Sequence, residues 1–272
     1  MDYKIVASDL DGTLLNSNSE LSAENAEAIR LLTERGVVFV PATGRSYAEI
    51  PTPLKESPYI RYYIHSGGAV IYDKMTNTRT LFCLSGEKSR AIFEAIFRQD
   101  CHVTVRMNGN IYSDKSLSDD RALDYYNVWG VHRDILFAQN GFVDNFRDAV
   151  MNAESVEQIS LFFHDDNDRQ PIIDEVGKLG GVNFAKACPF NLEITSSTAD
   201  KGNSLLVLAK SLGVQREATI GLGDSENDRS MVEAAGLGLA ASNSMPSVLA
   251  IADGVMCSND EHVAKYVLEK YF

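Results

Sequence analysis

Two aspartates stand two positions apart where the first apolar run of the chain ends. Asp9 and Asp11 follow the run 3–8 and are continued by Gly12 and Thr13. Residues two apart on an extended segment point to the same side, so we expect the two carboxylates to converge. One carboxylate of such a pair can act as a nucleophile while the other transfers protons. Taken alone, the segment also fits a polar turn, because Asp-Gly is a common turn dipeptide.

A hydroxyl, a glycine and a basic side chain follow the second apolar run. Thr43, Gly44 and Arg45 come after the run 37–41, which we predict to be a buried strand. If the first two strands are parallel neighbours, these residues lie at the same edge of the sheet as Asp9. The hydroxyl and the backbone amides could hold a phosphate there. The alternative is a capping threonine followed by a turn glycine.

An acidic segment follows a later apolar run. Residues 221–228 include Asp224 and Asp228, after a predicted strand over 219–222 and at the start of a predicted helix over 225–235. Carboxylates are again expected at the carboxyl end of a strand. Acidic residues that merely cap the helix are the alternative for this segment alone.

Two other kinds of binding loop do not fit these acidic segments. A dinucleotide loop needs a glycine where this chain has Glu226, and Asp224 would repel a bare pyrophosphate. A calcium loop needs glycine at its sixth position, which is Leu14 in the first segment and Arg229 in the later one. Both loop types are therefore excluded.

A lysine begins the predicted helix 201–212. Lys201 stands at the helix start, where the macrodipole favours carboxylates over cations, so its position calls for a reason. A charge that simply reaches solvent would explain any single lysine. In the company of the strand-end carboxylates, we interpret Lys201 as the charge partner of a phosphoryl group.

Together these segments predict a magnesium site for phosphoryl transfer. Oxygen ligands without histidine or cysteine select Mg²⁺, which binds one or two carboxylates together with substrate phosphate. Asp9 would attack phosphorus, and Asp11 would protonate the departing alcohol and later deprotonate the hydrolytic water. Lys201 would neutralise phosphoryl charge, while Thr43 and Asn227 would orient the group.

Strands alternate with helices near both ends of the chain. This alternation predicts right-handed βαβ units and a parallel sheet, with ligand sites at the carboxyl ends of the strands. The predicted elements are strands over 3–9, 37–41, 219–222 and 237–240, and helices over 22–35, 201–212 and 225–235. Both ends therefore belong to one α/β domain.

The middle of the chain has a different pattern. A predicted helix over 87–99 stands among strands of more exposed character over 102–107 and 158–163. We interpret this stretch as an inserted α+β domain. The predicted division is a core of residues 1–81 and 189–272, with an insertion over 82–188.

Composition limits the partners and the compartment. The 272 residues carry a net charge of −13, which disfavours nucleic acid and anionic membrane surfaces but allows a small anionic substrate in a cation-bearing pocket. No apolar run reaches the length of about 18 residues that a membrane span needs. We expect a cytoplasmic protein, monomeric or weakly homo-oligomeric. The scattered cysteines are expected to be small buried apolar residues rather than zinc ligands: Cys83, Cys101, Cys188 and Cys257.

The four motifs, in this order, resemble the haloacid dehalogenase-like hydrolase superfamily. The matching segments are Asp9-Leu10-Asp11-Gly12-Thr13, Thr43-Gly44-Arg45, Lys201-Gly202 and Gly223-Asp224-Ser225-Glu226-Asn227-Asp228. The position of the insertion is similar to the type IIB (C2B) cap of the Cof-like sugar-phosphatase branch. The resemblance implies a Rossmann-like core, an α+β cap domain and phosphatase activity on sugar phosphates and similar phosphomonoesters.

The resemblance also implies roles for individual residues. Mg²⁺ would be held by the side chains of Asp9 and Asp224 and by the backbone carbonyl of Asp11, with Asp228 supporting this shell. Catalytic roles would fall to Asp9, Asp11, Thr43 and Lys201. The substrate-binding residues would be Thr43, Gly44, Arg45, Lys201 and Asn227.

The chain departs from the family pattern at one position. Many Cof-like members have Asn-Gly-Ala after the strand that precedes the cap, whereas this chain has Ser66 before Gly67-Gly68-Ala69. Since serine can still donate one hydrogen bond, we expect altered substrate positioning rather than lost chemistry. Loops over 106–114 and 125–134 would select the substrate.

The aromatic residues of the second loop could form a surface that selects the substrate or part of the core of the insertion, and we expect the core: Tyr125, Tyr126 and Trp129.

Three alternatives stay open. A receiver-like phosphoacceptor switch would share the clustered aspartates, but it would carry its acceptor on a middle strand, and here that strand ends in Thr43. A phosphomutase of the phosphomannomutase type would return the phosphate to a sugar. A binding protein without turnover is disfavoured, because none of the expected catalytic side chains is missing.

Overall fold

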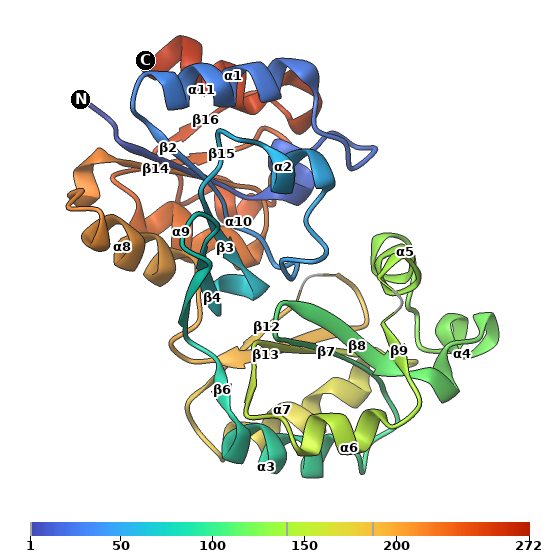
Figure 1. Ribbon diagram of the computed structural model, residues 1–272. Helices are drawn as coiled ribbons and strands as arrows, with labels where there is room; N and C mark the ends of the chain where they lie inside the picture. Colours follow the sequence, from blue (N-terminus) through green and yellow to red (C-terminus); the bar gives the residue numbers. More distant parts are fainter. Residues whose placement is uncertain (1, 140, 187) are drawn as a thin grey trace. The chain divides into compact units, whose positions relative to one another are not determined.

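Five parallel strands form the sheet that carries the motif residues. Their order is β16-β15-β14-β1-β2, and the bounds are Gly254–Val255, Leu237–Ala240, Thr219–Gly223, Ile5–Ser8 and Val38–Pro41. The three central strands are almost wholly buried, as expected for a parallel sheet covered on both faces. The structure, a computed structural model, describes residues 2–139, 141–186 and 188–272 (Figure 1).

The chain divides into two units. The core unit comprises the described residues of Met1–Gly44, Ile50–Leu81 and Asp200–Phe272, and the insert unit comprises Arg45–Glu49 and the described residues of Phe82–Ala199. The predicted ranges differ from these units at residues 45–49 and 189–199. The second difference has a clear cause, because strand β13 (Asn191–Ser196) pairs with strands of the insert unit.

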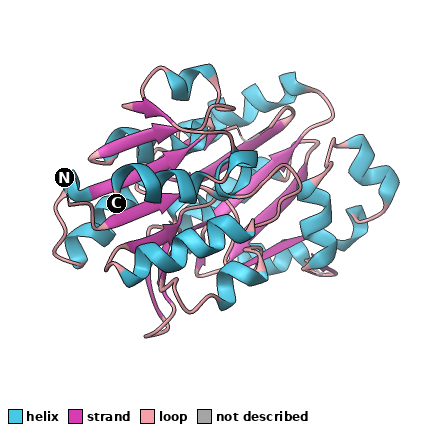
Figure 2. Ribbon diagram, turned by 90° about the horizontal axis from the view of Figure 1, so that it is seen from above, coloured by secondary structure: helices cyan, strands magenta, loops and turns pink. Residues whose placement is uncertain are grey.

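Helices cover the core sheet. Helix α1 (Ala23–Glu34) starts as predicted at Ser22, whose Oγ accepts a hydrogen bond from Asn25 N at 3.2 Å, and the chain turns at Gly36 with φ +82°. It lies beside α11, and helices pass over the strands in the second view (Figure 2). The other core helices are α2 (Thr52–Glu56), α8 (Lys201–Ser211), α9 (Arg229–Ala234), α10 (Pro246–Leu249) and α11 (Val263–Tyr271).

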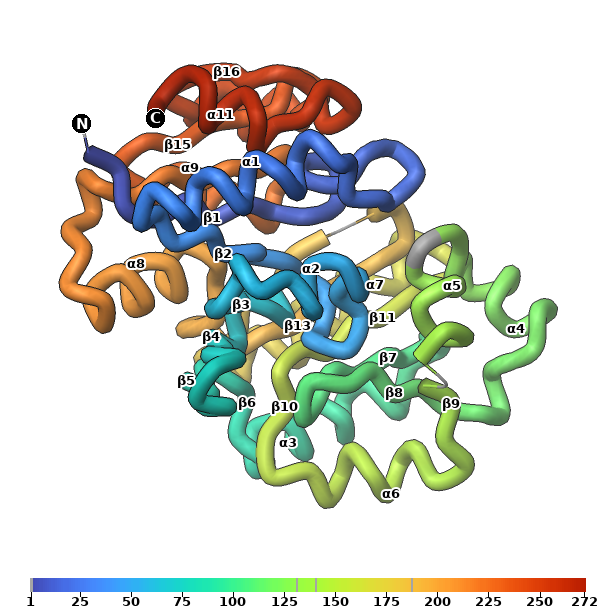
Figure 3. The backbone as a smooth tube through the Cα atoms, turned by 45° about the horizontal axis from the view of Figure 1, so that its top comes forward, coloured from blue at the N-terminus to red at the C-terminus, as the bar shows by residue number. Residues whose placement is uncertain are grey.

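The two ends of the chain meet in the core unit. The ring of Tyr3 lies 6.1 Å from that of Tyr271 and 6.2 Å from that of Phe272, and Figure 3 shows the blue and red ends together. A small antiparallel sheet of β3 (Tyr62–His65), β4 (Val70–Asp73) and β5 (Thr78–Leu81) also belongs to this unit. A parallel bridge between Ala42 and Ile64 joins it to the end of β2.

The predicted helix over 225–235 is interrupted. A short 3₁₀ turn, η6 (Glu226–Asp228), precedes α9. The side chain of Asp228 accepts hydrogen bonds from the backbone amides of Asp224 and Ser225, each at 3.0 Å. This capping holds the first turn in a tighter form than an α-helix.

The insert unit is built on a six-stranded sheet. The strand order is β12-β13-β11-β7-β8-β9, and the strands besides β13 are Val182–Ala185, Gln158–Phe162, His102–Met107, Asn110–Asp114 and Phe142–Val143. Its helices are α3 (Gly86–Ile96), α4 (Asp120–Tyr125), α5 (Val131–Ala138), α6 (Phe146–Met151) and α7 (Arg169–Gly177). A two-stranded ladder joins β6 (Leu84–Ser85) to β10 (Ser155–Val156).

The prediction of exposed strands over 102–107 and 158–163 is wrong. Every residue of β7 and β11 is buried. Alternate residues such as Val105 and Ile159 belong to the hydrophobic core of the unit, together with residues of α3 and α7. Polar residues such as Arg106 and Gln158 are also buried, and they hydrogen-bond to each other. Alternation of apolar and polar types therefore does not indicate solvent on one face here.

Two further predictions about burial are wrong in part, since Cys101 is buried as expected and Tyr126 packs, partly buried, against a core cluster. Of the cysteines only Cys101 is buried, while the other three are partly exposed. Tyr125 and Trp129 are 45% and 55% exposed rather than in the core. The small cluster beneath α4 and α5 is instead filled by aliphatic side chains and one phenylalanine: Ile111, Leu123, Val128, Leu136 and Phe162.

Candidate active site

The turn after β1 shapes one side of the site. Residues Leu10–Leu14 form a π-type turn in which Gly12 has φ +79°. A Cβ at Gly12 would lie 2.5 Å from Asp224 Oδ2, so only glycine fits. The turn also directs Thr13 Oγ1 to donate to Asp224 Oδ1 at 2.9 Å. Asp11, in the same turn, is exposed.

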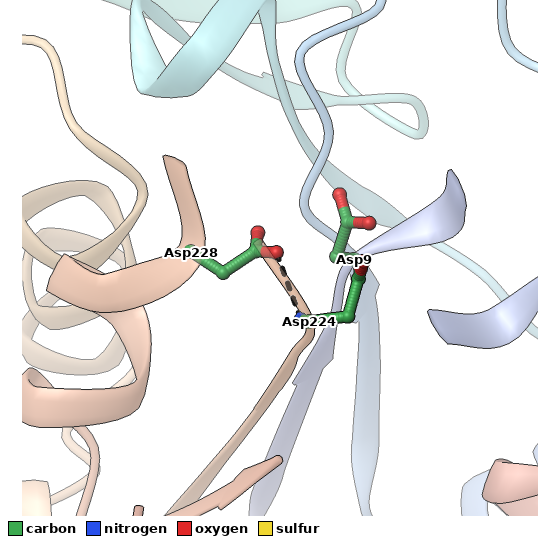
Figure 4. A group of neighbouring side chains, drawn as sticks. All are labelled: Asp9, Asp224 and Asp228. Atoms are coloured by element: carbon green, nitrogen blue, oxygen red, sulfur yellow. Dashed lines mark hydrogen bonds between the residues drawn. The ribbon is translucent and has the colours of Figure 1, made fainter. Parts of the chain in front are cut away.

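The parallel register of β1 and β14 brings two carboxylates together. Ser8 pairs with Leu222, and the amide of Asp9 donates to the carbonyl of Leu222 at 2.9 Å. Asp9 and Asp224 therefore leave neighbouring strands at the same edge of the sheet. Figure 4 shows them side by side with Asp228, whose carboxylate accepts a hydrogen bond from the amide of Asp224.

Lys201 joins the two sides of this carboxylate group. Its Nζ donates to Asp9 Oδ1 at 2.5 Å and to Asp228 Oδ1 at 2.6 Å. The lysine side chain is fully buried, although it stands at the start of α8. Asp200 caps that helix by accepting from Asn203 N at 2.7 Å. Lys201 is thus a buried charge partner rather than a solvent-exposed surface lysine.

Burial and mutual repulsion set the protonation of the group. Burial, followed by the charge of Asp228, raises the pKa of Asp9 well above its ordinary value, although Lys201 opposes the shift. Burial and Asp228 also raise the pKa of Asp224 to about 6. Burial alone would lower the pKa of Lys201, but the charges of Asp228 and Asp9 outweigh it and raise that pKa. Three carboxylates around one ammonium leave an excess of negative charge.

This arrangement fits a divalent cation. One carboxylate oxygen from each of Asp9, Asp224 and Asp228 lies within 4.8 Å of the others. Both oxygens of Asp228 accept hydrogen bonds, from Lys201 and from backbone amides. Asp9 and Asp224 each use Oδ1 in a hydrogen bond with Lys201 or Thr13. An all-oxygen donor set of this charge suits Mg²⁺.

The second motif lies at the end of β2, next to β1. Thr43 is buried, and its amide donates to the carbonyl of Ile64 at 2.9 Å. A Cβ at Gly44 would lie 3.7 Å from Asn227 Nδ2, so the second and fourth motifs meet there. Arg45 is grouped instead with the insert unit, and its Nη1 donates to the carbonyl of Glu49 at 3.1 Å.

A left-handed turn links the second motif to Lys201. Ser66, Gly67 and Gly68 have φ values of 52°, 66° and 93°. The amide of Gly67 donates to the carbonyl of Thr43 at 3.1 Å. A Cβ at Gly68 would lie 2.3 Å from the carbonyl carbon of Asp200, immediately before Lys201. The turn therefore seats the start of α8.

Sequence reasoning assigned no role to three residues that the structure places here. Thr13 bonds to Asp224, and Ser225 Oγ bonds to Asn227 Oδ1 at 2.9 Å. Gly68 packs against the start of α8. The signal for Thr13 was its place in the first motif, whereas the contact of Gly68 with residue 200 spans too much of the chain to be seen in a pattern.

Comparison with known proteins decides the family. The family model described as haloacid dehalogenase-like hydrolase matches residues 6–268. The chain belongs to this family. The predicted α/β fold with a cap domain and the assignment as a hydrolase of phosphoric monoesters are thereby confirmed.

Relatives of this hydrolase match over nearly their whole length. The phosphatase YwpJ of Bacillus subtilis (strain 168) is 29% identical over 98% of this chain and 99% of its own. From the same organism, the 5-amino-6-(5-phospho-D-ribitylamino)uracil phosphatase YcsE is 27% identical over 98% and 95%. A solved haloacid dehalogenase-like hydrolase from B. subtilis is 27% identical, with a TM-score of 0.83 over 99% of this chain and 100% of that one.

In the described parts of the hydrolase, no helix is both long and apolar enough to cross a membrane.

Proposed function

We propose that this hydrolase is a Mg²⁺-dependent phosphatase of small phosphomonoesters, with sugar phosphates as its substrate class. Asp9 would be its nucleophile and would carry the phosphoryl group as an aspartyl phosphate. The observation that carries the proposal is the buried carboxylate of Asp9, which lies at the end of β1 within 2.5 Å of Lys201 Nζ. No histidine or cysteine belongs to this described cluster of acidic groups.

The first half of the reaction transfers the phosphoryl group to the protein. A carboxylate oxygen of Asp9 attacks phosphorus, and the bond between phosphorus and the ester oxygen breaks. Asp11 gives its proton to the departing alcohol. Its exposed position in the turn after β1 suits a group that exchanges protons during each cycle.

The second half returns Asp9 to its starting state. Water attacks phosphorus and its proton passes to Asp11, while the bond from phosphorus to the Asp9 oxygen breaks and inorganic phosphate leaves. Lys201, which stays protonated, offsets the negative charge on Asp9 and the phosphoryl oxygens. Thr43, Gly44, Arg45 and Asn227 would bind those oxygens.

The proposed ion has defined protein partners. The side chains of Asp9 and Asp224 and the backbone carbonyl of Asp11 would hold Mg²⁺. Asp228 would keep Asp224 in place by accepting from its amide at 3.0 Å. When bound, Mg²⁺ would supply Lewis-acid neutralisation of the phosphoryl oxygens. The excess of carboxylates over ammonium in the described site supports this assignment.

Two observations support a small metabolite as the substrate. The relative YcsE is named for the phosphate ester of a ribityl group, which is a sugar alcohol. The net charge of −13 disfavours long polyanions such as nucleic acid. We therefore propose a phosphorylated sugar or polyol, and neither nucleic acid nor a membrane surface, as the partner.

The experiment is phosphate release from a panel of sugar, polyol and nucleotide phosphates, with Mg²⁺ and with EDTA. Turnover should require Mg²⁺ and should fall by about a thousandfold or more in Asp9→Asn and Asp9→Ala. Asp148→Asn, the same chemical change at an exposed position of α6, is the matched control and should keep full activity.

Acid quenching during turnover tests the intermediate directly. Mass spectrometry should find a phosphorylated peptide that contains Asp9 in the wild type and none in Asp9→Ala. Wild-type turnover retained by Asp9→Ala would refute the nucleophile assignment. Full activity in EDTA would refute the metal dependence.

A further inference from the structure

A five-residue segment leaves the core unit within the second motif, directly after Gly44. Arg45–Glu49 packs with the insert unit, although Gly44 before it and Ile50 after it belong to the core unit. The amide of Ala48 donates to the carbonyl of Gly109, in the turn between β7 and β8, at 3.0 Å. The shape of this segment therefore depends on residues of the insert unit.

Glu49 organises the segment from its far end. Its carbonyl accepts from Arg45 Nη1 at 3.1 Å, and its Oε2 accepts from the amide of Ser46 at 2.5 Å. Backbone and side chain of one residue thus hold both the arginine of the second motif and the residue after it. Displacement of Glu49 would release both contacts.

Glu49 is in turn held by an arginine of β7. Arg106 Nε donates to Glu49 Oε2 at 2.8 Å, and Nη2 donates to Oε1 at 2.9 Å. The two side chains are 5% and 0% exposed. The third nitrogen of the guanidinium is bound as well. Its Nη1 donates to Gln158 Oε1 at 3.1 Å and to Ser160 Oγ at 3.2 Å. This two-pronged geometry fixes the orientation of both partners.

Stability alone does not account for this cluster. Burial of an ion pair costs about as much desolvation energy as the attraction returns, and apolar replacements are often neutral. The charges of Glu193 and Glu157 also act on Arg106, so the local balance is acidic. One buried atom of the cluster, Gln158 Nε2, has no hydrogen-bond partner among the described residues. An unsatisfied buried polar atom costs stability, so its presence calls for an explanation.

We propose that Glu49 and Arg106 are positioning residues of the phosphatase reaction, which hold Arg45 in the orientation required for substrate binding. This inference rests on the proposed function, in which Arg45 binds phosphoryl oxygens. The chain of contacts runs from Arg106 to the carboxylate of Glu49, and from the carbonyl of Glu49 to Arg45 Nη1. Loss of the pair should weaken substrate binding and leave the chemistry at Asp9 intact.

A double-mutant cycle tests this path. Arg45→Ala and Glu49→Gln should each raise KM for the best phosphomonoester by about tenfold, with kcat within about threefold of wild type. If Glu49 acts through Arg45, the double variant should have the same KM as Arg45→Ala alone. If Glu49 has a purely structural role, the increases in KM of the two single variants should instead multiply in the double variant.

A second variant keeps the test valid if Glu49→Gln does not fold. Arg106→Lys retains the buried positive charge but loses the fork that grips both carboxylate oxygens. It should fold, raise KM by about tenfold, and add nothing to Arg45→Ala. The control is Asp73→Asn, which breaks the two-pronged pair with Arg61 in the core unit and should leave KM unchanged.

The outcomes separate this inference from the proposed function. Multiplicative effects in the cycle, or an unchanged KM in folded Arg106→Lys, would overturn the positioning role even if Asp9→Ala is inactive. Activity of Asp9→Ala would overturn the proposed mechanism whatever the cycle shows.

Discussion

His102 makes the stability of the insert unit depend on pH. Its ring is fully buried at the start of β7, beside the rings of Tyr126 and Phe162, and its Nε2 lies 3.3 Å from Ser113 Oγ. Burial lowers the pKa of His102 from 6.5 to about 4, although the charge of Asp114 opposes the shift. Between about pH 6.5 and pH 4 the imidazole therefore takes up a proton in the unfolded chain but stays largely neutral in the folded protein.

The magnitude follows from that difference. One pKa unit corresponds to about 1.4 kcal/mol, so the free energy of unfolding should fall by about 2 kcal/mol between pH 7 and pH 5 because of His102 alone. The loss should reach about 3 kcal/mol at pH 4 and level off below it. Above pH 6.5 the residue is neutral in both states and contributes no pH dependence.

Urea unfolding at pH 7 and pH 5 measures this term. In His102→Gln the loss of stability between the two pH values should be smaller than in the wild type by about 2 kcal/mol, because all other titrating groups cancel in the comparison. An equal loss in His102→Gln and wild type would refute the reasoning, as would an NMR titration of His102 near pH 6.5.

Three further predictions concern the site. Gly12→Ala should lower turnover by about tenfold or more, because its Cβ would lie 2.5 Å from Asp224 Oδ2. The control is Gly36→Ala, which has a similar φ but open space around the added Cβ. It should lower stability by about 1 kcal/mol and leave activity unchanged. Gly68→Ala should lower kcat, since its Cβ would lie 2.3 Å from the carbonyl carbon of Asp200 and displace the start of α8; activity assays check both variants. Mg²⁺ at about a hundredfold excess over its Kd should stabilise the wild type by about 2.7 kcal/mol in thermal unfolding, and Asp224→Asn should lose most of this gain.

Sequence patterns predict the core of this protein well. The strands ending near Asp9 and Asp224 are short and mostly apolar, a pattern typical of a parallel sheet covered on both faces. The helix start at Ser22 and the turn at Gly36 follow local chemistry that acts within a few residues. Features that depend only on neighbouring residues, such as this helix start and this turn, can therefore be predicted from the sequence.

Long-range partners are what the patterns could not provide. Glu49 and Arg106 stand 57 positions apart, and neither residue type suggests burial before the pair is known. The strand over 102–107 was likewise expected to be more exposed, whereas every residue of β7 is buried. For Trp129 the error was the opposite one, because it was predicted in the core and is exposed. Mainly aliphatic side chains fill the cluster beneath α5 instead.

The strand-end argument brought most of the predicted site together. The structure places Asp9, Lys201, Asp224 and Asp228 in direct or near contact. Arg45 could not be placed by this argument, because its position depends on Glu49 rather than on the end of β2. The catalytic roles of these residues stay predictions until the variants are measured.

The assignment of Arg45–Glu49 to the insert unit has a consequence for protein engineering. The polypeptide passes between the units at four places, after Gly44, Glu49, Leu81 and Ala199. A chimera that exchanges only residues 82–199 with a relative would leave Glu49 facing a foreign sheet without Arg106. Grafts intended to change substrate preference should therefore carry residues 45–49 with the donor insertion. Chimeras made both ways, compared for solubility and for KM, would show whether the two segments must be transferred together.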